Sequence, residues 1–265
     1  MPLTRYQHDV VQLLAANRSE DSHLAGGSAI HIDPQTIRYS NDLDYFHDSV
    51  ERVATAYADD VTRLADAGHS VIIEMQLPGY IRATVSRGGD RTKIEWAHDS
   101  AWRFMPTVRH PVAGYVLHPV DLAVNKLLAL AGRDEASDFL DVLDLDRRTL
   151  TLGALCWAAS GKDPGFTPLA LLEILRRRGK YQPQDFARLA LTASVDLPDL
   201  KRRWLAALDD ADAFVRSRPP AEAGCLYYSR RASGFVAPSA TDAADAVPHF
   251  GRPGGVLPRI VEDGR

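Results

Sequence analysis

Three strand-like patterns between Ser70 and Trp96, separated by tight-turn residues, are the feature that most constrains the fold of this chain. The turn residues are the dipeptide Pro78-Gly79 and the tripeptide Gly88-Gly89-Asp90. Because short turns of this composition join consecutive strands, the pattern predicts an antiparallel meander. The expected strands cover 71–77, 80–86 and 91–96.

The chain changes from strand-like alternation to helical periodicity at His118-Pro119. Before this point, helical patterns at 5–17 and 49–67, a strand pattern at 37–46 and short extended pieces at 104–108 and 114–117 accompany the meander. After it the patterns are helical, at 119–132, 134–145, 151–160, 167–178, 183–192 and 198–216. The pattern fails after Pro219-Pro220, and 231–265 holds few large apolar residues.

These patterns predict an α+β fold in three parts. We expect an α/β domain over 1–117 with a mixed or antiparallel sheet. An all-helical domain over 118–218 follows, and then a poorly packed tail over 219–265 that has little core of its own.

The composition is that of an ordinary globular protein, with 45% hydrophobic and 25% charged residues. No apolar run approaches the roughly 18 residues that a membrane span needs, and the first residues lack the apolar core of a signal peptide. We therefore expect a cytoplasmic protein that does not cross a membrane. Two cysteines, Cys156 and Cys225, make neither a disulfide framework nor a zinc site.

The net charge of −4 argues against a general, non-specific nucleic-acid-binding protein. Three basic clusters nevertheless lie in the C-terminal half, at 176–180, 201–203 and 230–231. Each by itself is more typical of a solvated surface or helix end. Together they favour an RNA-facing surface more than any one of them does.

Two acidic residues, Asp42 and Asp44, alternate with apolar residues in the strand predicted at 37–46. Side chains two apart on a strand leave the same face, about 6–7 Å from each other. Magnesium prefers oxygen ligands and usually takes one or two protein carboxylates together with substrate phosphates. The pair can hold such an ion, although an exposed polar strand face explains the same pattern.

Two further segments can complete a site around these carboxylates. The turn Gly26-Gly27-Ser28 opens a predicted helix, where backbone N–H groups and the serine hydroxyl can receive a phosphate, although most such triplets only start a helix. Glu95 on the last meander strand, with Lys93 on its face, can bring a third carboxylate to the metal. A surface position on a half-exposed sheet explains Glu95 equally well.

A third set of charged residues lies at helical spacing in the second half. Lys126 and Arg133 are seven residues apart and share a helix face, and Asp138 and Asp141, three apart, share another. A lysine near a nucleotide neutralises triphosphate charge during nucleotidyl transfer, and Asp138 can hold either cation or orient an acceptor hydroxyl. The alternative is a ladder of surface ion pairs.

Other catalytic patterns are missing from the sequence. It holds no Gly-x4-Gly-Lys phosphate loop, no Gly-x-Gly-x-x-Gly, no His-Glu-x-x-His and no Gly-x-Ser-x-Gly elbow. These absences argue against the enzyme classes that depend on such motifs.

The order of Gly26-Gly27-Ser28 and then Arg38-x-Ser40-x-Asp42-Leu43-Asp44 resembles the signature of polymerase-β-type nucleotidyltransferases. More narrowly, it resembles the AbiEii-type toxins of type IV toxin–antitoxin systems, which include the MenA-like toxins. The residues Lys126, Arg133, Asp138 and Asp141 match the fourth motif of that family position by position.

The resemblance covers roughly residues 20 to 145, and its middle motifs are weaker. The second motif, a basic-aromatic strand, is matched at best by Arg82 beside Tyr80. The third is here Lys93-Ile94-Glu95, with glutamate where aspartate is common. This departure puts the metal role of Glu95 in doubt.

The resemblance implies a polymerase-β-like core followed by a helical domain. It implies that Asp42, Asp44 and Glu95 bind Mg²⁺, that Gly27, Ser28, Lys126 and Arg133 hold a nucleoside triphosphate, and that Asp138 takes part in catalysis. It also implies transfer of a nucleoside monophosphate to the 3′ end of a tRNA by a toxin that an antitoxin controls. A protein or antibiotic acceptor, and an inactive binding module with the same fold, remain alternatives.

Overall fold

The computed structural model describes residues 3–32, 36–239 and 245–259. Contacts divide them into two compact units. The first unit holds 1–102, 106–122 and 189–194, and the second holds 103–105, 123–188 and 195–265. Among the described residues, no helix is both long and apolar enough to span a membrane.

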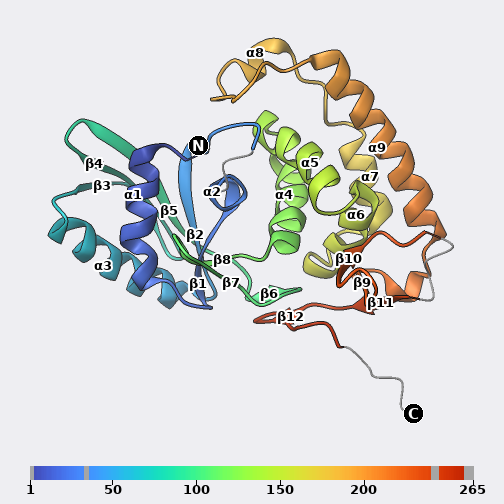
Figure 1. Cartoon of the computed structure of the whole chain (residues 1–265), viewed down its shortest axis with the longest axis horizontal. Coiled ribbons are helices and arrows are strands. Elements are labelled where there is room, and N and C mark those ends of the chain that lie inside the picture. Colours follow the sequence, from blue (N-terminus) through green and yellow to red (C-terminus); the bar gives the residue numbers. More distant parts are fainter. Residues whose placement is uncertain (1–2, 33–35, 240–244, 260–265) are drawn as a thin grey trace. The chain divides into compact units, whose positions relative to one another are not determined.

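A seven-stranded mixed sheet forms the first unit, in the order β3-β4-β5-β2-β1-β8-β7 (Figure 1). Its strands are β1 (Ser22–Ala25), β2 (Asp42–His47), β3 (Ser70–Leu77), β4 (Tyr80–Arg87), β5 (Asp90–His98), β7 (Val108–His110) and β8 (Gly114–Val116). The meander predicted from the turns is confirmed, because β3, β4 and β5 pair antiparallel. Strand β2 runs parallel to β5 and antiparallel to β1.

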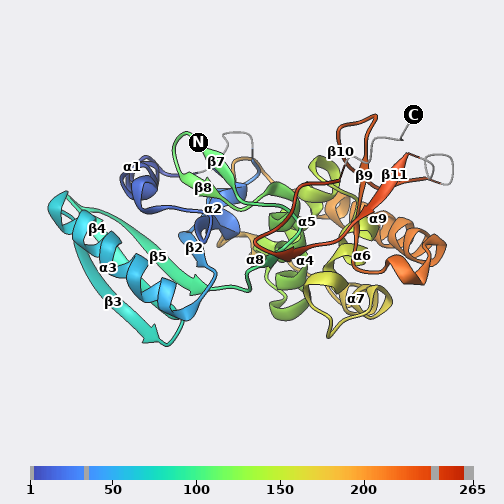
Figure 2. The same ribbon diagram turned by 90° about the horizontal axis from the view of Figure 1, so that it is seen from below.

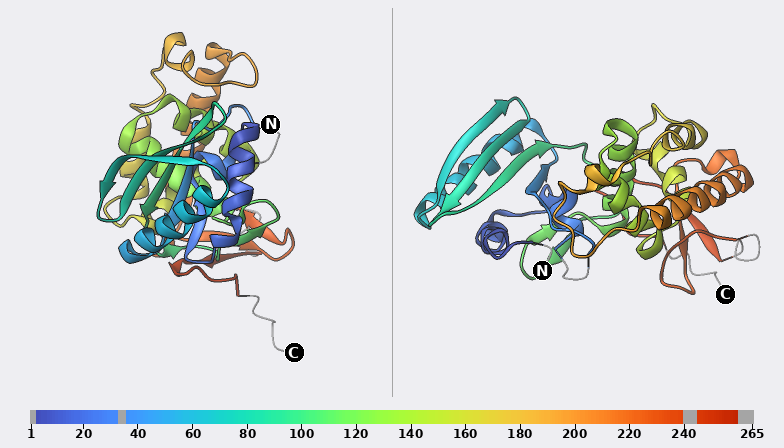
Figure 3. Two further views of the ribbon diagram at one scale, coloured as in Figure 1. Left: turned by 90° about the vertical axis from the view of Figure 1, so that its left-hand side faces the viewer. Right: turned by 90° about the horizontal axis from the view of Figure 1, so that it is seen from above.

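Two helices of the first unit pack on the sheet, α1 (Arg5–Leu14) and α3 (Val50–Asp66). Figure 2 and Figure 3 show α3 lying against one face of the meander. The alternating residues on that face are buried, among them Leu43, Tyr45 and Trp96. The residues that alternate with them, including Asp42 and Asp44, are on the opposite face, so the apolar layer determines where the polar residues point. The unit also contains the short helices η1 (Ala15–Asn17) and α2 (Gly26–Ile30).

A buried ion pair lies within the covered side of the sheet. Arg18 pairs with Asp60 of α3, and the side chains of both residues are fully buried. Asp60 Oδ1, which pairs with Arg18, also accepts a hydrogen bond of 2.8 Å from the Asn17 side-chain amide. Asp60 Oδ2 accepts a hydrogen bond of 2.8 Å from the Trp96 indole. The guanidinium of Arg18 lies 4.4 Å from the centre of the Tyr45 ring. The network thus joins α3, β5, β2 and the segment before β1.

The second unit is mainly helical, as the sequence predicted. Its helices are α4 (Pro119–Arg133, whose first four residues belong to the first unit), α5 (Ala136–Arg148), α6 (Leu152–Lys162), α7 (Pro168–Leu175), α8 (Pro183–Phe186) and α9 (Leu197–Ser217). Helix α6 is buried over all its sides from Leu152 to Ala159 and packs against α7 and α9, so it forms the centre of this core.

Residues 219–259 correct the expectation of a poorly packed tail. After η2 (Pro220–Glu222), the strands β9 (Leu226–Ser229), β10 (Gly234–Val236) and β11 (Ala246–His249) form a sheet in the order β10-β9-β11, and β12 (Arg252–Pro253) pairs with β6 (Trp102–Arg103). Cys225, Leu226 and Tyr227 are buried, and the Trp157 indole donates to the Glu222 carbonyl. Short strands with few large side chains hid this sheet in the sequence.

Two other predicted elements are shorter in the structure than the sequence pattern indicated, for a common reason. The strand predicted at 37–46 begins only at Asp42, and the helix predicted at 183–192 ends at Phe186. The backbone of 37–39 instead pairs with that of 190–192, which lies far away in the sequence. The Tyr39 N–H donates to the Ala190 carbonyl, and the Thr192 N–H donates to the Ile37 carbonyl. These bonds replace the sheet and helix hydrogen bonds that the patterns suggested.

We expect Asp60→Ala to lower the free energy of unfolding by about 3–5 kcal/mol, because it leaves the buried Arg18 cation without its carboxylate. The control is Asp59→Ala, the exposed neighbour on the same helix, with an expected change within about 0.5 kcal/mol. Urea denaturation measures both. Equal stability of the two variants would contradict the role assigned to the ion pair.

Candidate functional site

Asp42 and Asp44 stand at the beginning of β2, on the face of the sheet opposite α3. Both are half-buried. In the parallel pairing of β2 with β5, Asp42 is in register with Lys93 and Asp44 with Glu95. Side chains in register share a face of the sheet, so the predicted strand face is observed and carries three carboxylates and a lysine.

The turn Gly26-Gly27-Ser28 holds Asp44 in place. The N–H of Gly27 donates to Asp44 Oδ2 at 3.2 Å. The Ser28 hydroxyl accepts from the Asp44 N–H and donates to the Ala25 carbonyl, both at 3.0 Å, and it is fully buried. The backbone of Gly26 has φ +55°, and a Cβ there would come within 2.1 Å of Asp44 Oδ2. Only glycine therefore lets this carboxylate approach the turn.

Arg38 and Ser40, to which the sequence pattern assigned no role of their own, lie beside this turn. A Cβ on Gly27 would lie 3.1 Å from the Arg38 guanidinium and 3.2 Å from Ser40 Oγ. Ser40 donates to the carbonyl of Asp42 at 2.9 Å, and Arg38 donates to the carbonyl of Tyr39 at 3.0 Å. The spacing Arg38-x-Ser40-x-Asp42 was the available signal, because it places all three next to the glycine turn.

Glu95 is engaged by a cation on the neighbouring strand. Arg82 lies 2.7 Å from Glu95 Oε1, and the same guanidinium lies 5.6 Å from the centre of the Tyr80 ring. Burial, followed by the charge of Glu95, raises the pKa of the Tyr80 hydroxyl to about 12. Within the described residues no group of three or more His, Cys, Asp or Glu is placed to hold a metal. Asp42 and Asp44 offer two carboxylates of the kind that magnesium takes, and Glu95 beside them is held in an ion pair with Arg82.

The same face of the sheet is hollowed. A cavity of about 610 Å³ is lined by residues of β2 to β5, among them Asp42, Glu74, Arg82, Lys93 and Glu95. Lys93 Nζ lies 3.5 Å from Glu74 Oε2, so both cations named here face a carboxylate. The hollow is polar and alternates in charge, which suits a ligand that carries both phosphates and hydrogen-bonding groups.

The second unit contains the cluster around Asp138. Lys126 Nζ on α4 lies 2.8 Å from Asp138 Oδ1 and 3.3 Å from Asp141 Oδ2, both on α5. Arg133 Nε lies 2.6 Å from Asp138 Oδ2, and its Nη2 donates to Oδ1 at 3.0 Å. The two aspartate side chains are fully buried and that of Lys126 is 7% exposed, whereas that of Arg133 is 60% exposed.

Charge pairing dominates the protonation of this cluster. Burial acts to raise the pKa of Asp138, but the hydrogen bonds from Arg133 and the charge of Lys126 outweigh it and lower the pKa below its usual value. The carboxylate is therefore ionised at neutral pH. The sequence allowed either a ladder of exposed ion pairs or an aspartate that holds the two cations. Because Asp138 and Asp141 are buried, the second interpretation describes the cluster.

Comparisons with known proteins identify the fold. No protein-family model matches the chain, and no curated protein matches it. Among solved structures, MenT4, a nucleotidyltransferase toxin of Mycobacterium tuberculosis, aligns over 82% of this chain and 83% of its own, with a TM-score of 0.52 and 16% identity. The protein JHP933 of Helicobacter pylori aligns over 80% and 91%, with a TM-score of 0.50 and 15% identity. The chain thus has the fold of a nucleotidyltransferase, as the resemblance implied.

We expect Gly26→Ala to be more destabilising than Gly88→Ala, although the two glycines have similar backbone angles of φ +55° and +60°. An alanine Cβ at Gly88 meets nothing within 4 Å, whereas at Gly26 it collides with Asp44. The difference in unfolding free energy should be about 1–3 kcal/mol, the cost of overpacking. Equal losses, measured by urea denaturation, would show that the contact with Asp44 does not constrain the turn.

We expect Asp138→Asn to cost about 3–5 kcal/mol of stability at neutral pH, because it breaks a buried ion pair. Since the folded-state pKa of Asp138 is lowered, its contribution is complete above the unfolded pKa near 4 and is lost as the pH falls through the lower folded value. The control Asp144→Asn, in the partly exposed pair with Arg148, should cost about 0–1 kcal/mol. Denaturation at several pH values measures both, and a gap that does not narrow in acid would contradict this account.

Proposed function

We propose that this protein is a magnesium-dependent nucleotidyltransferase that moves a nucleoside monophosphate from a nucleoside triphosphate to an acceptor hydroxyl. The observation that carries the proposal is the pair Asp42 and Asp44, on one face of β2, with Asp44 held by the turn Gly26-Gly27-Ser28. The fold shared with MenT4, itself a nucleotidyltransferase toxin, supports it.

In this proposal Asp42 and Asp44 hold one or two Mg²⁺ ions. Bound there, the metal supplies neutralisation of triphosphate charge and activation of the attacking hydroxyl. Gly27 and Ser28 orient Asp44 through the two hydrogen bonds described above, which is a positioning role in place of the direct phosphate contact expected from the sequence. Glu95, paired with Arg82, is assigned to positioning and not to the metal.

For the α4–α5 cluster of the second unit we propose a role of its own, in which its cationic residues bind phosphate. Arg133 exposes 60% of its side chain while Asp138 fixes its guanidinium, so it is oriented and accessible to an anion. Lys126 is held between Asp138 and Asp141, and this geometry suits a lysine that shares its charge with a phosphate without moving far. Asp138 is the positioning residue for both cations, and its lowered pKa keeps it charged in this role.

For the acceptor we propose the 3′ end of a tRNA, and for the biological role a cytoplasmic toxin that a cognate antitoxin controls. The fold shared with the toxin MenT4 and the sequence motifs that resemble those of AbiEii-type toxins support this choice. A protein or an antibiotic as acceptor keeps the same chemistry, and an inactive binding module keeps the same fold. The intact residues Asp42, Asp44, Lys126 and Asp138 favour an enzyme over the inactive module.

We expect the purified protein with Mg²⁺ and α-labelled nucleoside triphosphates to transfer label to total tRNA. Asp42→Ala should lower the rate at least about 100-fold, because loss of a group that supports a metal typically costs 10–100-fold and a direct ligand more. The surface variant Asp59→Ala should keep the wild-type rate. Equal transfer by Asp42→Ala would refute the metal site.

The same labelling reaction distinguishes the alternatives. Offered tRNA, protein and aminoglycoside fractions separately, the enzyme should label tRNA. Label in another fraction alone would keep the nucleotidyltransferase and replace its acceptor. No label in any fraction, together with no heat of binding for any of the triphosphates with Mg²⁺, would favour the inactive module.

A further inference from the structure

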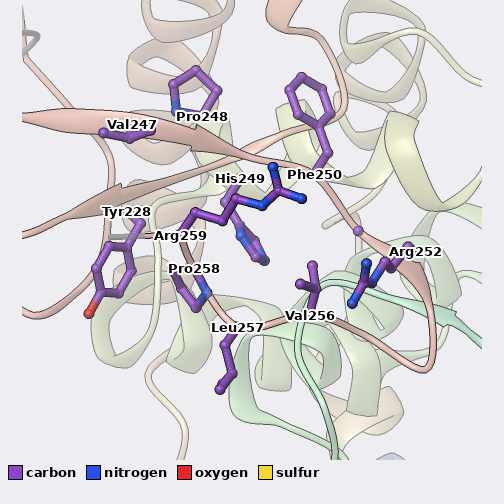
Figure 4. A pocket seen from close by; sticks show the side chains of 11 residues that line it. Tyr228, Val247, Pro248, His249, Phe250, Arg252, Val256, Leu257, Pro258 and Arg259 are labelled. Atoms are coloured by element: carbon purple, nitrogen blue, oxygen red, sulfur yellow. The ribbon is translucent and has the colours of Figure 1, made fainter. Parts of the chain in front are cut away.

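The small sheet near the C-terminus carries a pocket that the proposed chemistry does not use. It has a volume of about 270 Å³ and lies in the second unit, between β9, β11 and the segment 250–259. Figure 4 shows the aromatic rings of Tyr228, His249 and Phe250 among its lining residues, together with the guanidinium groups of Arg252 and Arg259. A pocket of this size holds one flat ring or one side chain and is too small for a drug-sized molecule.

The side chains that give this pocket its charge are cationic. Its lining residues among those that the structure describes include two arginines and no aspartate or glutamate. In the described part of the chain, Arg252 makes only a hydrogen bond of 3.5 Å to the Gly255 carbonyl, and neither arginine has a carboxylate partner. Both are exposed. The pocket therefore suits an anion.

The arginines of α9 and of the segment that follows α7 in the same unit are different. Arg176 and Arg216 pair with Asp212 at 3.1 and 2.6 Å, and Arg178 pairs with Asp134 at 3.1 Å. Arg202 pairs with Asp199. The clusters 176–180 and 201–203, in which the sequence suggested an RNA-facing surface, thus have much of their charge balanced within the fold. The charge at Arg252 and Arg259 is left for a ligand.

The walls of the pocket favour a nucleobase next to that anionic group. Phe250 leaves 49% of its surface exposed, and the Tyr228 ring is held at 5.5 Å from Phe235 in an edge-on contact. Such rings stack on bases irrespective of sequence. His249 Nε2 lies 2.9 Å from the Phe104 carbonyl and so carries the proton, and burial lowers the pKa of His249, which keeps the ring neutral. Its Nδ1 is then a hydrogen-bond acceptor, which a base amino group can satisfy and a carboxylate cannot.

We propose that this pocket binds one unpaired base of a single-stranded RNA, with the adjoining phosphates on Arg252 and Arg259. An acidic peptide would use the arginines equally well but would leave the aromatic walls and the histidine acceptor without a matching group. The proposal concerns RNA binding alone, so it stands or falls separately from nucleotidyl transfer. Where the proposed function holds, the pocket deepens it as a binding site for the acceptor.

The test measures binding of a short fluorescein-labelled single-stranded RNA to the full chain by fluorescence anisotropy, without nucleoside triphosphate or Mg²⁺. Arg252→Ala/Arg259→Ala should weaken binding at least about tenfold at moderate salt. The slope of log K against log salt should decrease by about 1.4, which corresponds to two phosphate contacts on a single strand. The control Arg202→Ala/Arg216→Ala removes the same charge from arginines that are already paired and should change binding less than about threefold.

A second pair of variants tests the stacking surface. Phe250→Ala should weaken binding at least about fivefold, whereas Leu205→Ala on α9, also an exposed apolar residue, should leave it unchanged. Both positions are exposed enough that truncation should not affect folding, which thermal denaturation checks. An RNA duplex of the same sequence should bind more weakly than the single strand, because its bases are not accessible.

Three results would overturn the proposal. Equal weakening by the two arginine double variants would show a general charge effect. Normal binding by Phe250→Ala would show that no base stacks there. Tighter binding of a polyglutamate peptide than of the RNA by the wild type, lost in Arg252→Ala/Arg259→Ala, would make the pocket a peptide site. Because Asp42→Ala should bind RNA normally, an inactive enzyme does not count against the pocket.

Discussion

The buried ion pair of Arg18 with Asp60 is the interaction on which the geometry of the first unit depends. Asp60 accepts from Trp96 on β5, and Arg18 stacks on Tyr45 of β2. Tyr45 follows Asp44 directly, so a shift of one residue in β2 would turn the carboxylates toward α3 and the ring toward the hollow. By holding Tyr45 inward, this buried ion pair determines on which face of the sheet Asp42 and Asp44 lie. Its cost of desolvation is offset only because nearly every lone pair and proton finds a partner.

The parts of the fold that the sequence could predict are those with local signals. The turns of the meander, the alternation around Asp42 and Asp44, and the helical spacing of Lys126 with Arg133 and of Asp138 with Asp141 all act within a few residues, and each was found where it was expected. The physical reason is that side-chain direction follows directly from the period of a strand or a helix. The side of a strand or helix on which a residue lies is therefore more predictable than the residue at which that strand or helix begins or ends.

The rest depended on partners that lie far away in the sequence. The start of β2 is determined by backbone bonds between Ile37–Tyr39 and 190–192, and no local pattern encodes a pairing over that distance. Glu95 shares its face with Asp44 as predicted, but no local pattern shows that the partner strand brings Arg82 within 2.7 Å of it. The tail held a sheet for a similar reason, since its short strands are stabilised by buried contacts with α6. A local sequence pattern shows which face of a strand or helix a residue occupies, but not which distant residue packs against that face.

The same limit explains why a count of basic residues misplaces the sites for anions. Lys126 and Arg133 form a cluster with Asp138 and Asp141 that has no net charge, and this pairing fixes the orientation of the two cations. The arginines of α9 and of the segment after α7 pair with Asp199 and Asp212, and Asp212 is shared by Arg176 and Arg216. Arg252 and Arg259, which form no run in the sequence, keep their charge in the described structure. An anion is attracted by cationic side chains that have no carboxylate partner in the folded protein. In this chain the tertiary contacts, and not the composition, determine which side chains these are.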